Sequence, residues 1–381
     1  MVDFDEFVVM KEGFLKKLNI AIDTIIEEKQ SMKLDYDIIE KVLKAMIKNR
    51  NVSNSAVSVV VTIDRNQLLS ITLDFFNSID SEFYKKAIEI ILQQNNDIKI
   101  NIYNVHDVSN FKKRDEDNFV EHTPYGVVQT RNGHALVNIP TRTELEGEEE
   151  NIVNKKDCTL EDLYAVVHEI AHLFDLNLDI GKPTKNEIAG EKETYEDNIT
   201  RELTGEATTI AFEGLLSEYL LKNTAYPKAA IQQISNNRIN SCLQKARIVY
   251  SRLLLAREKM ERGEITLDFI EKLMRDYNLS IQDVRYMASS IINSPKDMLM
   301  HNRYAIGGLL APTIIKTYKT KGSDALKRYL EEAKKCDLES ALKQIGIQLN
   351  DEGINEVIRN FQEHMQLYNL DIKERWIALY G

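Results

Sequence analysis

The chain has 381 residues, of which 43% are hydrophobic and 29% charged, and it carries a net charge of −11. These values are typical of a globular protein with a large core, and they exclude a wholly disordered chain. The negative charge argues against a nucleic-acid partner, because such an interface needs a basic surface. Only six prolines and fifteen glycines occur, and long segments have helical periodicity, so we expect a mainly α fold.

The N-terminal residues show no basic stretch followed by an apolar run, so we expect no signal peptide. No stretch is apolar over the length of a membrane span, and we expect no membrane partner. The isolated cysteines Cys158, Cys242 and Cys336 are odd in number and lack a metal-binding spacing, which indicates reduced thiols. Together these features predict a cytoplasmic protein, and they leave its oligomeric state open.

Helical and strand patterns alternate before the central motif of the chain. Helical periodicity predicts helices over residues 4–28, 36–48, 66–76 and 81–94. Strand-like patterns occur at residues 57–63 and 98–105, and over a hairpin at residues 126–140 that turns at Asn132-Gly133. We therefore expect an N-terminal helical lobe over residues 1–97, followed by a small sheet and hairpin over residues 98–140.

The second half of the chain is predicted to be almost entirely helical. One helix is expected from Thr159, as N-cap with Asp162 completing a capping box, to about residue 176. From residue 199 onward, helical patterns are broken only near residues 223–227, 263–266, 294–295 and 322–323. We assign residues 98–381 to one domain, with two central helices at residues 159–222 and a C-terminal helical lobe at residues 227–381.

The most informative motif is His168-Glu169-Ile170-Ala171-His172. Two histidines four positions apart lie on the same face of a helix, where both can bind one metal ion. A glutamate beside the first histidine can take a proton from a water on that metal. The alternative is a chance motif whose histidines bind local polar groups. The apolar flanking residues favour a metal site.

A catalytic zinc site needs a third protein ligand, and the next strong helix offers carboxylates. Glu206 and Glu213 are seven positions apart and share one face of that helix, among small and apolar neighbours. Two buried carboxylates need positive partners, and a metal for Glu206 and a ligating imidazole for Glu213 would provide them. Glu202 is the competing ligand. Gly205 and Gly214 disfavour a helix interior, and we explain both by close approach of the motif helix.

Together, the motif at residues 168–172 and the segment at residues 205–221 resemble the oligoendopeptidase F and thimet oligopeptidase group of zinc peptidases. Glu206 and Glu213 match the family's glutamate ligand and its second glutamate, two turns later, and Thr209 lies in the matching context. The resemblance implies a zincin-type core between helical lobes, Zn²⁺ as the cofactor, and peptides as substrates.

Residues 304–311 are similar to the tyrosine-bearing segment of the same family, which implies that Tyr304 donates a hydrogen bond to the oxyanion. The resemblance also implies that a peptide pairs with the strand at residues 134–139, so Ala135 and Val137 are predicted to contact substrate. We also predict that His301, one turn before Tyr304, contacts substrate. Gly307 and the next glycine are interpreted either as a mobile hinge or as a point of tight helix packing.

The chain departs from the family at several points. Ala171 replaces a glycine, the family's histidine upstream of the tyrosine is replaced near Asn293 and Ser294, and the chain is short. We predict a zinc peptidase that hydrolyses short peptides. Two alternatives stay open: a carboxypeptidase-type enzyme using Arg142 or Arg303 to bind a substrate terminus, and an inactive binding protein with a peptidase fold.

Overall fold

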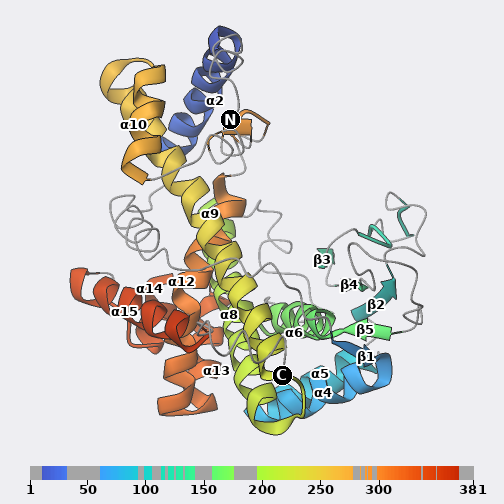
Figure 1. The fold of residues 1–381 in the computed structure, drawn as a ribbon. Helices are drawn as coiled ribbons and strands as arrows, with labels where there is room; N and C mark the ends of the chain where they lie inside the picture. The colour runs from blue at the N-terminus through green and yellow to red at the C-terminus, as the bar shows by residue number, and fades with distance from the viewer. Residues whose placement is uncertain are drawn as a thin grey trace. The chain divides into compact units, whose positions relative to one another are not determined.

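A computed structural model describes residues 11–31, 61–92, 98–104, 113–115, 119–123, 126–131, 134–141, 157–175, 195–277, 284, 288–289, 291–293, 298–335, 338–348 and 350–368. The chain is mainly helical with a small amount of β-structure, as its sequence predicts (Figure 1). It divides into two compact units, the first formed by Met1–Arg50 and Ser241–Ile306 and the second by Asn51–Asn240 and Gly307–Gly381. This grouping differs from a division at residue 97. Among the described residues, no helix is long and apolar enough to cross a membrane.

The first unit contains α2 (Lys11–Ser31), the second half of α9 (Lys228–Arg262), α10 (Leu267–Tyr277) and the start of α12 (Met298–Lys321). The side chain of Asn19 fixes α2 to the α9–α10 connection. Its amide donates to the carbonyl of Ile265 over 3.2 Å and accepts from the N–H of Ile265 over 2.9 Å. Lys259 adds an ion pair with Asp23 of α2.

The second unit contains most of the helices. They are α4 (Arg65–Ile79), α5 (Ser81–Ile91), α6 (Leu160–Asp175), α8 (Tyr195–Asn223), the first part of α9, the rest of α12, α13 (Ser323–Ala333), α14 (Leu338–Gln344) and α15 (Asp351–Tyr368). The predicted helices at residues 66–76 and 81–94 correspond to α4 and α5. The predicted breaks near residues 223–227, 263–266 and 322–323 are also present, the last at Gly322 with a φ of 77°.

An aromatic cluster joins four of these helices. Phe75 and Phe76 of α4, Phe83 of α5, Phe174 of α6 and Phe212 of α8 are all buried. Phe174 and Phe212 approach to 5.8 Å between ring centroids, and Phe76 and Phe174 to 5.1 Å. Tilted and edge-to-face pairs of this kind add about 0.5–1.5 kcal/mol each beyond the burial of area. The cluster therefore holds α6 against α8 from one side.

The main sheet has three strands in the order β2-β4-β3. Strand β2 (Ile98–Asn104) runs parallel to β4 (His134–Thr141), and β3 (Val127–Arg131) forms an antiparallel hairpin with β4. A second pair joins β1 (Thr62–Asp64) to β5 (Asp157–Thr159), directly before α6. The hairpin and the strand at residues 98–104 are as predicted, but the position of β4 in the centre of the sheet is not.

Helix α6 begins where the sequence predicts. The backbone N–H of Thr159 donates to Asp162 Oδ2 over 2.6 Å, and the N–H of Asp162 donates to Thr159 Oγ1 over 3.2 Å. This reciprocal pair satisfies two of the donors that a helix start leaves unbonded. The predicted helix at residues 36–48, the turn at Asn132-Gly133, the break at residues 294–295, Arg142 and Cys336 lie outside the described residues. Cys158 and Cys242 are free and buried.

Candidate metal centre

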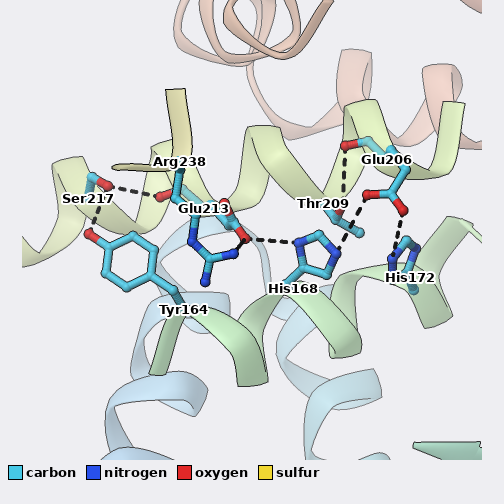
Figure 2. A network of polar contacts seen from close by, with 8 residues as sticks. All are labelled: Tyr164, His168, His172, Glu206, Thr209, Glu213, Ser217 and Arg238. Atoms are coloured by element: carbon cyan, nitrogen blue, oxygen red, sulfur yellow. Dashed lines mark hydrogen bonds and ion pairs between the residues drawn. The ribbon is translucent and has the colours of Figure 1, made fainter. Parts of the chain in front are cut away.

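Helices α6 and α8 lie side by side, and each contributes part of one polar cluster (Figure 2). Most residues of helix α6 are buried, as expected of a helix that is covered on most sides. His168 and His172 are the polar exceptions on the face toward α8. Their rings are 4.8 Å apart between centroids and 82° to each other, because residues four apart lie one helical turn above each other.

Glu206 of α8 faces both histidines and is 3% exposed. His168 Nε2 lies 3.7 Å from Glu206 Oε2, and His172 Nε2 lies 3.9 Å from Glu206 Oε1. Each ring nitrogen thus points to a different oxygen of the same carboxylate (Figure 2). One ligand atom from each of the three residues can be chosen so that all lie within 4.8 Å of one another.

This arrangement fits zinc. Ligand atoms at 2.0–2.2 Å from a tetrahedral ion lie about 3.4 Å apart. The distances of 3.7 and 3.9 Å from the two histidines to Glu206 are close to this value, and all three ligand atoms lie within 4.8 Å of one another. Two imidazoles and one carboxylate are also the ligand types of a catalytic zinc site that leaves a fourth position for water. The predicted residues His168, His172 and Glu206 therefore form a compact three-ligand set. Glu202, the competing ligand, has a side chain outside the described residues.

Glu213 lies behind His168, two turns along α8 from Glu206. Its Oε1 is 2.9 Å from His168 Nδ1, so the ring can donate to it while Nε2 faces the ligand cluster. Burial lowers the pKa of His168, but the hydrogen bond to Glu213 and three neighbouring carboxylates outweigh it and raise that pKa to about 9. The surroundings thus favour positive charge, which a divalent cation on the neutral imidazole also provides.

Arg238 of α9 is a site residue that the sequence interpretation missed. Its Nη1 lies 3.3 Å from Glu213 Oε1, on the side of Glu213 away from the ligand cluster (Figure 2). Burial raises the pKa of Glu213, but Arg238 and His168 hold it below its ordinary value. The sequence does contain one indication of this role for Arg238. The buried polar residues Gln232 and Ser235 precede it at intervals of three, so all three lie on one face of the helix.

A hydrogen-bonded group extends the cluster along the three helices. Ser217 Oγ lies 2.8 Å from the hydroxyl of Tyr164 and 2.8 Å from that of Ser235, and it donates to the carbonyl of Glu213 over 3.0 Å. The group joins α6, α8 and α9 at one level. Burial raises the pKa of Tyr164 to about 12, so its hydroxyl stays protonated and can donate.

Glu169 projects from α6 next to the ligand cluster and is 6% exposed. Burial, supported by the charges of Glu206 and Glu213 and opposed by His168, raises its pKa to about 7. Its Oε2 is buried without a hydrogen-bond partner among the described residues. A buried carboxylate oxygen without a partner is costly unless a water, an ion or a substrate group satisfies it. A raised pKa and an acceptor with no partner among the described residues make Glu169 a candidate general base.

Two of the predicted substrate contacts are wrong. Ala135 and Val137 lie on β4, where each is paired with β2 on one side and with β3 on the other. Both side chains are also buried. An added peptide strand needs a free edge, so it cannot pair at these residues. The sequence shows the β3–β4 hairpin, but the parallel pairing of β2 with β4 depends on tertiary structure.

The predicted residues of α12 lie in the first unit. Tyr304 is half-buried, and the guanidinium carbon of Arg303 lies 5.0 Å from the centroid of its ring. His301 belongs to the same helix, and its side chain is outside the described residues. The roles of Tyr304 and His301 stay predictions.

Two glycines mark close helix contacts, one of them at Glu206. A Cβ on Gly307 would lie 2.9 Å from the backbone nitrogen of Ala207 and 3.1 Å from Glu206 Cβ. Gly307 thus lets α12 pack on the backbone that carries Glu206, which agrees with tight packing and not with a hinge. Gly214 faces Ile315 of α12, and a Cβ on Gly214 would lie 2.5 Å from Ile315 Cδ1. The prediction that Gly214 faces the motif helix is wrong.

The fold and the cluster define a mainly helical protein with a candidate metal site between two adjacent helices. Among solved structures, the chain is similar to a protein of Chlamydophila abortus assigned as a peptidase, with a TM-score of 0.52 and 11% identity over 93% of this chain and 55% of that one. It is also similar to a Bacillus anthracis protein assigned as an oligoendopeptidase F, with a TM-score of 0.52 and 8% identity over 93% of this chain and 60% of that one.

These likenesses show that the chain has an oligoendopeptidase-like peptidase fold, as its sequence motifs imply. The chain spans 55% and 60% of the lengths of the two proteins. No protein-family model matches its sequence, and no curated protein matches it.

Proposed function

We propose that this protein is a zinc-dependent peptidase that hydrolyses peptide bonds in short peptides. The observation that carries the proposal is the three-ligand set of His168, His172 and Glu206 beside a carboxylate oxygen of Glu169 that has no partner among the residues the structure describes. The three-ligand set by itself would also fit a metal site with a purely structural role. A buried carboxylate with a pKa of about 7 beside an incomplete ligand set is typical of hydrolytic chemistry.

His168, His172 and Glu206 would hold the ion, and Glu213 would fix the ring of His168 through its Nδ1–H. When bound, zinc supplies Lewis acidity, which lowers the pKa of a coordinated water toward neutrality and polarises the substrate carbonyl. Arg238 keeps Glu213 ionised, so that Glu213 accepts the hydrogen bond from the ring and orients Nε2 toward the ligand cluster.

Glu169 accepts the proton of the attacking water at its unpartnered Oε2 and passes it to the amine that leaves. Burial raises the pKa of Glu169, which helps the carboxylate to hold the proton between the two transfers. Tyr304 donates a hydrogen bond to the carbonyl oxygen as negative charge develops there. This last role rests on the resemblance of residues 304–311 to the family segment.

We place the peptide along β3 and not along β4. Strand β3 is at one edge of the sheet, and no strand of the described residues pairs with its outer side. Its N-terminal end is the end nearer the general base, since Gly126 precedes it and contacts Glu169. An extended peptide paired there would be held mainly through backbone hydrogen bonds, which tolerates varied side chains.

Cleavage of a mixed peptide library tests the function, with free-ended and end-blocked forms of each peptide. We expect internal bonds to be cut in both forms, the activity to be lost in a chelator, and zinc to restore it. Cleavage of free-ended peptides alone would instead support the exopeptidase alternative. A protein that binds zinc and cleaves neither form would be an inactive peptidase-fold protein, and the proposal would be wrong.

A further inference from the structure

The backbone of Gly126 lies directly against the carboxylate of Glu169. A side chain at residue 126 would overlap Glu169 Oε1, and its Cβ would also lie 3.1 Å from Glu169 Cδ and 3.3 Å from Cγ. The carboxylate thus occupies the space that a Cβ would fill. This contact joins the start of β3 to the middle of α6, two segments far apart in the sequence.

The requirement for glycine at this position is one of space. The φ of Gly126 is not in the left-handed region, in contrast to Gly263, Gly322 and Gly346. Alanine can therefore adopt the same backbone conformation, and a substitution would test the contact without adding backbone strain.

Packing against Gly126 restricts the position of Glu169. Glu169 is 6% exposed, and its Oε2 has no hydrogen-bond partner among the described residues. A glutamate has three rotatable bonds, and ordering it costs rotamer entropy. A rigid backbone surface on one side limits those rotamers in a way that a mobile side chain would not. Correct placement matters, because a shift of about 1 Å can cost 10²-fold in rate.

We propose that Gly126 is a positioning residue for Glu169: its bare backbone forms the wall that holds the general base beside the three-ligand set. The consequence for catalysis rests on the proposed function. The contact between Gly126 and Glu169 does not, so it can be tested separately.

The kinetic test compares Gly126→Ala with wild type on one peptide. We expect kcat to fall at least about 10-fold, KM to change less than about twofold, and bound zinc to stay unchanged. Glu169→Asp withdraws the carboxylate by one methylene, so adding Gly126→Ala to Glu169→Asp should cost much less than it does in wild type. Gly13→Ala, at a glycine with open space around its Cβ position, is the control and should leave kcat unchanged.

The second test measures thermal unfolding and needs no activity. Gly126→Ala should lower Tm by about 2–4 °C or more, because the added methyl is overpacked against Glu169. In a Glu169→Ala background the same substitution should lower it little or not at all. An equal fall in both backgrounds, or an unchanged kcat in an active enzyme, would overturn the proposal. If wild type cleaves no peptide, the peptidase function fails, while the unfolding cycle still decides the role of Gly126.

Discussion

The three candidate metal ligands and Glu169, the proposed general base, lie side by side, but different interactions hold them in place. On the ligand side, Glu213 binds His168 and Arg238 pairs with Glu213. On the base side, one carboxylate oxygen of Glu169 has no hydrogen-bond partner within the described part of the chain, and the carboxylate is packed against Gly126. A hydrogen bond and an ion pair therefore orient His168, whereas packing against Gly126 restricts Glu169. Substitutions should separate metal binding from catalysis, with the largest loss of metal affinity at a ligand and the smallest far from the site.

Glu206→Gln should lower zinc affinity by about 100-fold or more, because it replaces a ligand and removes the charge that both histidines face. Competition with a chromophoric chelator measures the affinity. Glu202→Gln is the matched control, one turn earlier on α8, and should bind zinc like wild type. If instead the Glu202 variant loses zinc and the Glu206 variant retains it, the ligand assignment is wrong.

Glu213→Gln should weaken zinc binding by about 10–100-fold, since a neutral amide is a poorer partner for the Nδ1–H of His168. Glu218→Gln offers a control on the same helix, where Glu218 pairs with Lys319 at the surface. The same titration compares both variants with wild type. Equal affinity for the Glu213 variant and wild type would show that the contact behind His168 does not tune the site.

Gly307→Ala should destabilise the fold by about 1–3 kcal/mol, and the displaced backbone of Glu206 should weaken zinc binding by a smaller factor. Alanine in a helix gains up to about 1 kcal/mol in propensity, but the obstructing atoms belong to backbone and cannot move aside cheaply. Urea unfolding and zinc titration measure the two effects. Gly13→Ala should show the propensity gain alone, and equal behaviour of the two variants would rule out tight packing at Gly307.

Asp80→Asn should leave zinc affinity unchanged and lower stability at neutral pH by about 1 kcal/mol. Burial raises the pKa of Asp80, but hydrogen bonds from Lys327, the N–H of Glu82 and Ser323 outweigh it and hold the pKa below its ordinary value of 3.8. The charged form thus stabilises the fold above about pH 4, and this contribution is lost as the pH falls through the folded-state pKa.

Urea unfolding of wild type and Asp80→Asn at pH 7 and near pH 3 checks this prediction. The difference between the two proteins should shrink at the lower pH. A constant difference across this range would show that the charge of Asp80 contributes nothing.

Local spacing predicted that the candidate ligands would lie close together, and it predicted the main helices. The separation of His168 from His172 fixes their common face, and that of Glu206 from Glu213 does the same on the next helix. The capping box at Thr159 and the break at Gly322 are also local signals. Such features depend on a few neighbouring residues, which is why a single sequence carries them.

Contacts between distant segments were not predictable in the same way. The hairpin was visible, but nothing in residues 98–105 showed that this strand pairs with β4 and leaves β3 at the edge. Gly126 looks like any glycine before a strand, and only the packing of β3 on α6 brings it to Glu169. The role of Arg238 was only weakly indicated, by the regular spacing of polar residues along α9.

The most direct test of the account measures zinc content and peptide cleavage in wild type and Glu169→Gln, purified and assayed together. We predict about one zinc ion per chain in both proteins, and cleavage lowered by about 10²–10⁴-fold in the variant, because the base is lost while the ligands remain. Equal cleavage by the two proteins, or loss of zinc together with activity, would contradict the separation of base and ligands on which the proposed function rests.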